Sequence, residues 1–334
     1  MIRVSIIIIN YNGKNFTLDC LKALDKQSFR HYEIIVVDNG SSDNSSVEIQ
    51  ELRAGSNRAN PLKVVSLGYN SGFAGGNRIA LDLAQAEYVA LLNNDTEPDN
   101  NWLENIVGAM DAHHDAGICA SKMIVFGKDI IDSASDGYAT SLKGFKRGEG
   151  EHAEGYDNKE FVFGACAGAA LYRRKMLEEI GFFDEDFFLI HEDTDLNMRA
   201  QLAGWKILYV PTALVYHKVR STIGHMSDMA VYYTLRNSEF VRIKNVPFLL
   251  FMRCLPEFIL GTISEFIYFG VKHGKLGLYL KAKIDVLKKM RSMLRKRKKI
   301  MKMKKVSNTY LYSIMTPIWN REFFSTKMKK FFRE

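Results

Sequence analysis

The chain has 334 residues, of which 47% are apolar and 25% are charged. These values are average for soluble globular proteins and exclude a disordered chain, a collagen-like fibre and a small disulfide-stapled scaffold. The net charge of +8 is uneven, because residues 281–305 hold thirteen Lys or Arg and a single acidic residue, whereas residues 1–280 are net acidic.

The first 110 residues alternate short apolar runs with amphipathic stretches. Strict alternation of strand and helix indicates right-handed crossovers and an α/β fold with a mostly parallel, Rossmann-like sheet. Such sheets bind ligands at the carboxyl ends of their strands, so we expect the chemistry in the turns that follow them. Strands are predicted at 4–9, 33–37, 63–67 and 88–92, and helices at 16–27, 45–53 and 74–84.

The four turns that follow these strands are rich in Asn, Asp, Ser and Gly. Helix capping explains one such turn, but four polar turns at one end of a sheet indicate a ligand site. None of them has the Gly-rich fingerprint of a dinucleotide site or a P-loop. The turns read Asn10-Tyr11-Asn12-Gly13, Asp38-Asn39-Gly40-Ser41-Ser42-Asp43, Gly68-Tyr69-Asn70-Ser71-Gly72 and Asn93-Asn94-Asp95-Thr96.

Residues 111–225 mix short strands with glycine-rich joints. An apolar run at 187–190 leads into the sequence HEDTD at 191–195, which we interpret as the end of a strand that opens a helix at 196–202. Further strands are predicted at 206–210 and 213–216, the second ending at His217.

Four blocks stand in a fixed order in the chain: NYN at 10–12, IIVVDNGSSD at 34–43, LLNND at 91–95 and FFLIHEDTDL at 187–196. Together they resemble the inverting, nucleotide-sugar-dependent family 2 glycosyltransferases, which have the GT-A fold. The resemblance covers residues 2–225. It implies a catalytic domain at 1–225, with a nucleotide-sugar-binding half at 1–110 and an acceptor-binding half at 111–225. The stretch at 68–77 is similar to the rhamnosyltransferase branch, many members of which use dTDP-L-rhamnose to build bacterial surface polysaccharides.

The resemblance assigns the sugar-nucleotide donor to these turns. A carboxylate at Asp38 can accept the imide N–H of uracil or thymine, and Tyr11 can stack on the base. Small residues at Gly75 and Gly76 let the backbone approach the diphosphate closely. Relatives often carry Arg where this chain has Gly76, so a metal or another basic residue has to neutralise the diphosphate. The predicted donor-binding residues are Asn10, Tyr11, Asn12, Asp38, Asn39, Ser41, Asn70, Gly75, Gly76, Asn77, Asn93 and Asn94.

The sequence Asn93-Asn94-Asp95 takes the place of the family's DxD metal motif. Asp95 is its single charged group, and His217 ends a strand as the family's metal-binding His does. We therefore expect Mg²⁺ or Mn²⁺, held by few protein groups and by diphosphate oxygens. A structural role for His217 is the alternative.

Inverting transfer needs one base that takes the proton of the acceptor hydroxyl. The family draws this base from a Glu-Asp pair, which implies Asp193 as the base here and Glu192 as the second candidate. His191 stands where relatives often carry an aromatic residue. With Gly164 and Asp184, it is expected on the acceptor side, where turn geometry and packing are the alternative.

Residues 226–334 are predicted to form a helical, basic region. The segment 247–271 is apolar, but its charged residues recur along one stripe, which favours an amphipathic helix over a membrane-spanning one. In 281–305 an apolar stripe runs among basic residues, as in helices that lie on anionic membranes. Packing on a subunit or on the catalytic domain is the alternative, and the absence of interleaved aromatic residues argues against nucleic acid. This stripe is Ile284, Leu287, Met290, Leu294 and Met301.

The sequence therefore predicts an inverting glycosyltransferase that is cytoplasmic and peripheral on the inner face of the cell membrane. It would move L-rhamnose from dTDP-rhamnose to a glycan or lipid-linked glycan, and it could form a homo-oligomer. The alternatives are a UDP-hexose-dependent enzyme of the same fold and a non-catalytic sugar-binding scaffold. A nucleotidyltransferase would need a Gly- and Lys/Arg-rich loop at 10–13. The cysteines form no CxxC pair and are expected to be reduced thiols in a reducing compartment (Cys20, Cys119, Cys166 and Cys254).

Overall fold

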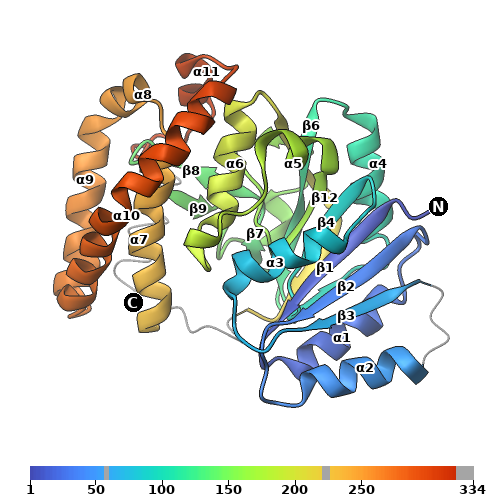
Figure 1. Cartoon of the computed structure of the whole chain (residues 1–334). Helices are drawn as coiled ribbons and strands as arrows, with labels where there is room; N and C mark the ends of the chain where they lie inside the picture. The colour runs from blue at the N-terminus through green and yellow to red at the C-terminus, as the bar shows by residue number, and fades with distance from the viewer. Residues whose placement is uncertain (56–59, 220–225, 321–334) are drawn as a thin grey trace.

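The computed structural model describes residues 1–55, 60–219 and 226–320, and Figure 1 shows a central sheet flanked by helices. The strands β3-β2-β1-β4 are parallel to one another, and the sheet continues through β11, β6, β12 and β10 with mixed directions. The bounds of these strands are β1 (Val4–Asn10), β2 (Tyr32–Asp38), β3 (Leu62–Ser66), β4 (Tyr88–Leu92), β6 (Ala116–Val125), β10 (Glu160–Val162), β11 (Ala169–Arg173) and β12 (Lys206–His217).

Helices cover both faces of this sheet, which explains why the parallel strands read as continuous apolar runs. Alternate residues of β1 point to opposite faces: Ile6 packs with helices α1, α2 and α4, and Ile7 packs with α3, α5 and α6. The expected α/β fold is thus confirmed. The helices are α1 (Lys14–Leu24), α2 (Ser45–Gly55), α3 (Gly72–Leu83), α4 (Trp102–Ala112), α5 (Arg174–Ile180) and α6 (Glu192–Leu202).

The register of the parallel strands brings their polar turns together. Asn10 lies opposite Asp38 in the β1–β2 pair, and Asp38 lies opposite Ser66 in the β2–β3 pair. The carboxyl ends of these strands therefore meet at one end of the sheet, where the sequence predicts the ligand site. Short strands flank it: β5 (Thr96–Pro98) on β12, β7 (Ile131–Ser133) on β6, and the pair β8 (Asp136–Tyr138) and β9 (Gly144–Lys146).

Two sequence predictions about the acceptor half are wrong in detail. The apolar run 187–190 is not the end of a strand: a 3₁₀ turn, η2 (Glu185–Phe187), is followed by left-handed backbone, and α6 begins at Glu192 instead of residue 196. Hydrogen bonds from α7 hold this loop, and the local sequence carries no sign of them. The two strands predicted at 206–216 are one strand, β12, with a register shift between Val210 and Leu214.

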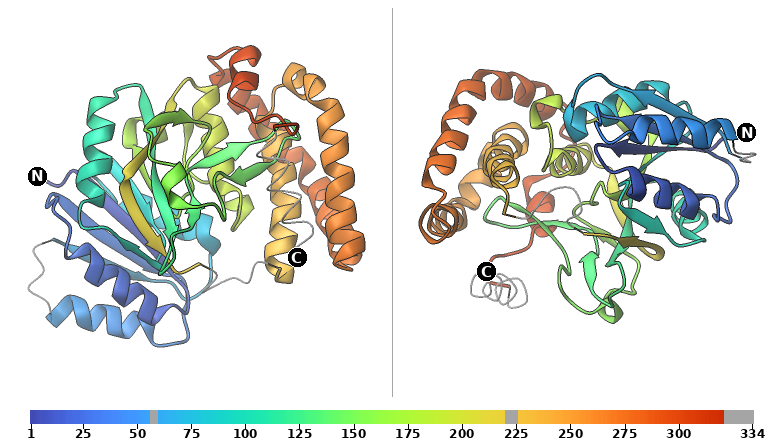
Figure 2. Two further views of the ribbon diagram at one scale, coloured as in Figure 1. Left: turned by 180° about the vertical axis from the view of Figure 1, so that it is seen from behind. Right: turned by 90° about the horizontal axis from the view of Figure 1, so that it is seen from below.

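The C-terminal helices pack beside the sheet domain (Figure 2). α10 lies along α7, and its Val286, Met293 and Ile300 share a core with Phe240 of α7. The helix predicted at 247–271 is interrupted, because the chain passes through α8, α9 and the π-helix η3. Among the described residues, none of the helices combines the length and the apolarity needed to span a bilayer. The bounds are α7 (Asp228–Asn245), α8 (Phe248–Arg253), α9 (Leu255–Glu265), η3 (Phe266–Lys272), α10 (Leu276–Met303) and α11 (Asn308–Ser313).

The four cysteines, all within the described residues, are free thiols as expected. Burial raises the pKa of the Cys20 and Cys119 thiols to about 12, so both stay protonated and unreactive.

Candidate active site

Asn10, at the end of β1, joins the turns at the carboxyl ends of the strands. Its Nδ2 donates to Asp38 Oδ1 at 2.8 Å and to Ser41 Oγ at 3.0 Å. Its Oδ1 accepts from the Thr17 hydroxyl at 2.8 Å and from Asn94 Nδ2 at 3.2 Å. Both amide hydrogens and both lone pairs of Asn10 are thereby used, so its side chain positions its neighbours.

Asp38 is the buried carboxylate at the end of β2. Its Oδ1 accepts from Asn10 and from the Ser41 hydroxyl, the latter at 2.5 Å. Its Oδ2 accepts the Ser41 amide at 3.3 Å, a long bond that leaves a lone pair for a ligand N–H. Tyr11 is 40% exposed, and Asn12 ties its turn to the next one by accepting from the Ser42 amide at 2.7 Å. This arrangement can bind a pyrimidine base.

Asn39 connects the turn after β2 to the turn after β3. Its Nδ2 donates to Asn70 Oδ1 at 3.0 Å, and its Oδ1 accepts from the Ser71 amide at 2.9 Å. The next residue, Gly72, has φ +76°, and a Cβ there would lie 2.5 Å from the carbonyl oxygen of Phe188. Glycine is required at this point, since the loop of the donor half touches the loop that precedes α6.

The predicted diphosphate residues lie within α3. A Cβ on Gly75 would be 3.0 Å from Ser71 Cβ, and one on Gly76 would be 3.2 Å from Ile9 of β1. Asn77 is buried and donates to the carbonyl of Phe73 at 2.9 Å. Close packing of Gly76 on β1 and of Gly75 on the start of α3 accounts for these small residues, and their contact with a diphosphate stays a prediction.

Asp95 and His217 face each other across the ends of β4 and β12. His217 Nε2 lies 3.2 Å from Asp95 Oδ1, and His217 Nδ1 lies 2.8 Å from Asp132 Oδ2. Burial alone would lower the pKa of His217, but the hydrogen bonds to Asp132 and Asp95 outweigh it and raise the pKa to about 9. Burial opposes ionisation of Asp132 too, yet His217 and Lys146 hold its pKa well below the usual value. Asp132 and Lys146 were not among the residues predicted from the sequence, because neither belongs to a motif.

This pair fits a divalent cation. Imidazole and carboxylate are accepted ligands of Mn²⁺, and a carboxylate on the second imidazole nitrogen, here Asp132, commonly orients a metal-binding His. Within the described residues no group of three or more His, Cys, Asp and Glu side chains could hold a metal, so a cation here would need oxygen ligands from the donor or water. Asn94 donates to Asn10 and Thr17, at 3.2 Å each, and so shapes the site.

The two adjacent carboxyl groups at the start of α6 differ in their surroundings. Glu192 is buried, and its Oε2 has no hydrogen-bond partner among the described residues. Burial, and then the charges of Asp193 and Asp136, raise the pKa of Glu192 well above its usual value. Asp193 is half-buried, and its Oδ2 accepts the Ala167 amide at 3.3 Å. Its Oδ1 accepts from the Thr194 amide at 2.6 Å. Glu192 therefore favours the protonated form, and Asp193 is the more exposed of the two carboxyl groups.

A short path of backbone contacts joins Asp193 to the Asp95 turn. Ala167 donates to Asp193, and the next residue, Gly168, accepts from the Asn93 amide at 2.8 Å. Asp193 is thus one loop away from the predicted metal ligands, although about a hundred residues separate them in the chain.

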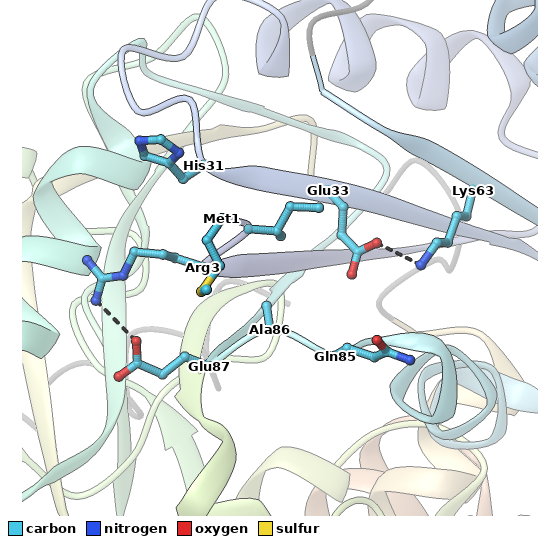
Figure 3. A pocket seen from close by; sticks show the side chains of 9 residues that line it. Met1, Arg3, His31, Glu33, Lys63, Gln85, Ala86 and Glu87 are labelled. Carbon is cyan, nitrogen blue, oxygen red and sulfur yellow. Dashed lines mark hydrogen bonds and ion pairs between the residues drawn. The ribbon is translucent and has the colours of Figure 1, made fainter.

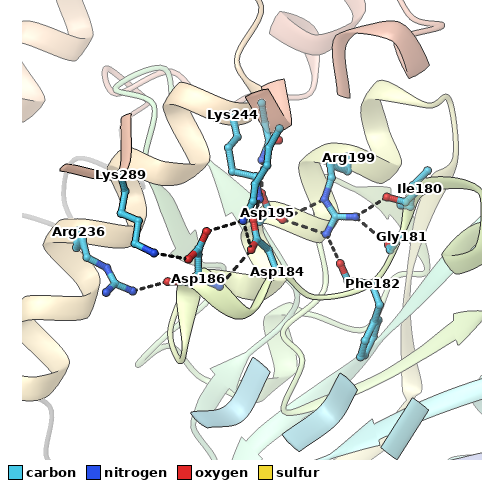
Figure 4. A network of polar contacts seen from close by, with 12 residues as sticks. Ile180, Gly181, Phe182, Asp184, Asp186, Asp195, Arg199, Arg236, Lys244 and Lys289 are labelled. Atoms are coloured by element: carbon cyan, nitrogen blue, oxygen red, sulfur yellow. Dashed lines mark hydrogen bonds and ion pairs between the residues drawn. The ribbon is translucent and has the colours of Figure 1, made fainter. Parts of the chain in front are cut away.

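The predicted acceptor-side residues have structural partners. His191 Nδ1 lies 3.2 Å from the Thr194 hydroxyl. Gly164 pairs with the backbone of Asp136, and a Cβ there would be 2.5 Å from Asn197 Nδ2. The carboxylate of Asp184 binds lysines of α7 and α10 in the network of Figure 4. Packing accounts for Gly164 and Asp184, and contacts of all three residues with an acceptor stay predictions.

A pocket lies at the opposite end of the sheet, at the amino ends of β1, β2 and β3 (Figure 3). Ion pairs cross it between Arg3 and Glu87 at 3.2 Å and between Lys63 and Glu33 at 2.8 Å. Ligands of open α/β sheets bind at the carboxyl ends of the strands, so this pocket is not the candidate active site.

A family model described as "Glycosyl transferase family 2" matches residues 5–181. The chain is 24% identical over 234 residues to poly(ribitol-phosphate) beta-N-acetylglucosaminyltransferase TarS of Staphylococcus aureus, covering 69% of this chain and 38% of TarS. It is 26% identical over 238 residues to poly-beta-1,6-N-acetyl-D-glucosamine synthase of Staphylococcus epidermidis, covering 71% of this chain and 55% of that protein. It is also 26% identical over 242 residues to amylovoran biosynthesis glycosyltransferase AmsB of Erwinia amylovora, covering 70% of this chain and 76% of AmsB. The chain thus spans about 38–55% of the first two relatives.

Solved structures share the fold. The crystal structure of S. aureus TarS 1-349 in complex with UDP-GlcNAc is 19% identical, covers 90% of this chain and 91% of that chain, and has a TM-score of 0.59. The crystal structure of GalNAc-T7 with UDP, GalNAc and Mn²⁺ is 17% identical, covers 73% of this chain and 48% of that chain, and has a TM-score of 0.60. The mannosyltransferase PcManGT from Pyrobaculum calidifontis, in complex with GDP-Man and Mn²⁺, is 16% identical, covers 90% of this chain and 86% of that chain, and has a TM-score of 0.54.

Proposed function

The chain belongs to glycosyltransferase family 2, and we propose that it moves a sugar from a pyrimidine nucleoside diphosphate to a glycan hydroxyl with inversion at the anomeric carbon. The observation that carries this proposal is the contrast between Asp193, partly exposed and one loop away from Asp95, and the buried Glu192. We assign donor binding to residues 1–110, acceptor binding to 111–225 and an accessory role to 226–334.

Asp193 is the proposed general base. It takes the proton of the acceptor hydroxyl while that oxygen forms its bond to the anomeric carbon. The bond from this carbon to the phosphate oxygen breaks, and its electron pair leaves with the nucleoside diphosphate. Asp95 and His217 would hold Mg²⁺ or Mn²⁺, whose charge stabilises that leaving group. His217 has to release its proton before it can serve as a ligand.

The donor sugar has two candidates, because the lone pair that remains on Asp38 Oδ2 suits the imide N–H of uracil and of thymine alike. The sequence at 68–77 supports L-rhamnose from dTDP-rhamnose. The relatives support a UDP-sugar, since two of them are named for N-acetylglucosamine and TarS was solved with UDP-GlcNAc. We further propose a peripheral position on the inner face of the cell membrane, with the acceptor glycan carried on a lipid.

Thermal unfolding tests the donor. The protein is heated with dTDP-rhamnose, UDP-GlcNAc, UDP-glucose or GDP-mannose, with and without Mn²⁺ or Mg²⁺. A donor at about a hundred times its Kd adds ~2.7 kcal/mol to the stability, a shift in Tm of roughly 4 °C at ~2.1 cal/mol/K per residue. A metal-dependent shift with one pyrimidine sugar identifies the donor. No shift with any of the four would contradict the proposed site and favour a non-catalytic scaffold.

Paired variants test the base. Asp193→Asn should lower turnover by roughly 10²–10⁴-fold and keep the donor-induced shift in Tm, because the base acts on the acceptor. The matched change Glu192→Gln should cost far less, since Glu192 already favours its neutral form. Equal losses of turnover in the two variants would contradict the proposal that Asp193 is the general base.

A further inference from the structure

The C-terminal helices expose an unusual amount of apolar surface. Of the 24 exposed large hydrophobic side chains among the described residues, 14 lie between positions 248 and 294. Three are on α8, three on α9, three on η3 and five on α10. Phe248, Leu249 and Leu287 are each about two-thirds exposed, with 66%, 68% and 66% of their surface in contact with solvent. Concentrated apolar surface of this kind marks a binding surface.

These side chains form stripes with helical spacing. On α9 and η3 the exposed positions are 259, 260, 263, 266, 267 and 271, and on α10 they are 276, 280, 284, 287 and 294. Spacings of three and four residues put each set on one side of its helix, opposite the side that packs inward. The two helices touch, because the rings of Phe266 and Tyr279 lie 5.6 Å apart and Lys283 reaches Glu265 at 3.1 Å. We call these two stripes, together with the exposed residues of α8, the outer face; the helices that carry it lie on the left of Figure 1.

Exposed basic side chains accompany the stripe on α10. Lys281, Lys288, Arg291 and Arg295 are exposed, and Arg291 continues the stripe between Leu287 and Leu294 at helical spacing. Two of the three acidic residues in 248–305 are already paired, Glu265 with lysines and Asp285 with Lys288. The outer face is therefore apolar and positively charged.

Other basic residues of the segment 281–305 form ion pairs with the rest of the chain. Lys283 pairs with Glu239 at 2.5 Å. Lys296 pairs with Asp184 at 2.5 Å and with Asp186 at 2.6 Å. Lys289 adds a second contact to Asp186 at 2.9 Å (Figure 4). Lys283 thus attaches α10 to α7, and Lys289 and Lys296 attach it to the loop before α6. Only part of the segment 281–305, together with α8, α9 and η3, is thus open to a partner.

We propose that the outer face docks on an anionic lipid bilayer, with α9 and α10 lying in the plane of the interface. A lipid surface accepts both features of the face: the apolar side chains enter the boundary between headgroups and acyl chains, and the basic side chains bind anionic headgroups. A symmetric contact with a second copy of the chain fits less well, because it would bring the same positively charged surface, with Lys281, Lys288 and Arg291, from both copies together. This docking extends the proposed function, whose lipid-linked acceptor it would bring to the enzyme.

One contact connects α9, the helix that carries part of the outer face, to the acceptor side. Lys143 donates to Gly261 O of α9 at 3.0 Å and to Glu265 at 2.5 Å. The next residue, Gly144, packs on Thr194, since a Cβ there would lie 3.0 Å from the Thr194 hydroxyl. Thr194 follows the proposed base Asp193, so the inward side of α9, opposite the outer face, contacts a segment that packs beside the proposed base.

Flotation of the full chain with lipid vesicles tests the proposal. We expect it to float with vesicles that contain phosphatidylglycerol, to float much less with phosphatidylcholine alone, and to lose binding as salt rises. The double change Ile263→Gln and Leu287→Gln should weaken binding at least tenfold. The matched change Val47→Gln on α2, at a side chain 55% exposed and outside this face, should leave binding unchanged.

Two controls separate this proposal from the proposed transfer. Because Ile263 and Leu287 are 51% and 66% exposed, the double variant should keep its Tm and any donor-induced shift in Tm. Loss of flotation with that shift intact supports docking, whatever the donor proves to be. No flotation with either vesicle would overturn the proposal. So would an oligomer in solution that the double variant dissociates, since the outer face would then be a protein interface.

Discussion

The loop that leads into α6, where the proposed base Asp193 lies, depends on one buried side chain of α7. Asn237 is fully buried, and its Nδ2 lies 2.9 Å, 2.7 Å and 2.7 Å from the carbonyl oxygens of Phe187, Leu189 and Ile190. The Phe187 oxygen also accepts from Arg236, at 3.0 Å, so the other two carbonyls depend most on Asn237.

This loop is strained. Phe188, Ile190 and His191 have φ values of 64°, 67° and 69°, a region that costs a non-glycine residue ~1–3 kcal/mol. Asn237→Ala would leave two buried carbonyls unsatisfied, at ~1–3 kcal/mol each. Water entry and the helix propensity of Ala offset part of this, so we expect a loss of about 2–4 kcal/mol. At ~2.1 cal/mol/K per residue, the Tm of the chain should fall by roughly 3–6 °C.

Turnover should fall as well, because the loop relaxes and moves the start of α6. A displacement of about 1 Å costs up to ~10²-fold in rate. The matched control is Ser238→Ala, at the next buried position of α7, whose hydroxyl bonds only to Leu235 O of its own helix, at 3.3 Å, among the described contacts. Thermal unfolding and kcat are measured for both variants. The reasoning is refuted if Asn237→Ala behaves like Ser238→Ala in both measurements.

Three further predictions follow from buried polar groups. Lys244→Met should lower the free energy of unfolding by ~3–5 kcal/mol, because it removes one cation from the buried carboxylate of Asp195, 2.9 Å away. The exposed change Lys288→Met should cost less than ~0.5 kcal/mol, and denaturant titration compares the two. Asp38→Asn should abolish the Tm shift caused by pyrimidine nucleotide-sugar donors. An unchanged shift would show that the pyrimidine ring of the donor binds elsewhere. The raised pKa of His217 stabilises the metal-free protein fully below the unfolded value of ~6.5, and this stability is lost as the pH rises through about 9. Affinity for Mn²⁺, measured by calorimetry, should therefore increase over that range, and His217→Gln should remove both trends.

The sequence alone determined the donor half of the fold. Strands buried on both faces of a parallel sheet read as short apolar runs, so β4 was predicted at its observed bounds and β2 within one residue at each end. Parallel strands also end at the same side of the sheet, which is why the turns at Asn10 and Asp38 could be expected to meet. The order of the four motifs indicated the family before any contact was known.

The tertiary structure decided the contacts between distant segments. Asp132 orients His217 across 85 residues, and Asn237 holds the loop at 187–190 from about fifty residues away. Neither lies in a local pattern, because a hydrogen bond between folded elements leaves no periodicity in the sequence. The difference between the buried and the exposed side of α10 was likewise decided by the tertiary structure. Helical spacing reveals apolar stripes, but only the packed neighbours decide that Met293 is buried against the domain while Leu287 faces outward.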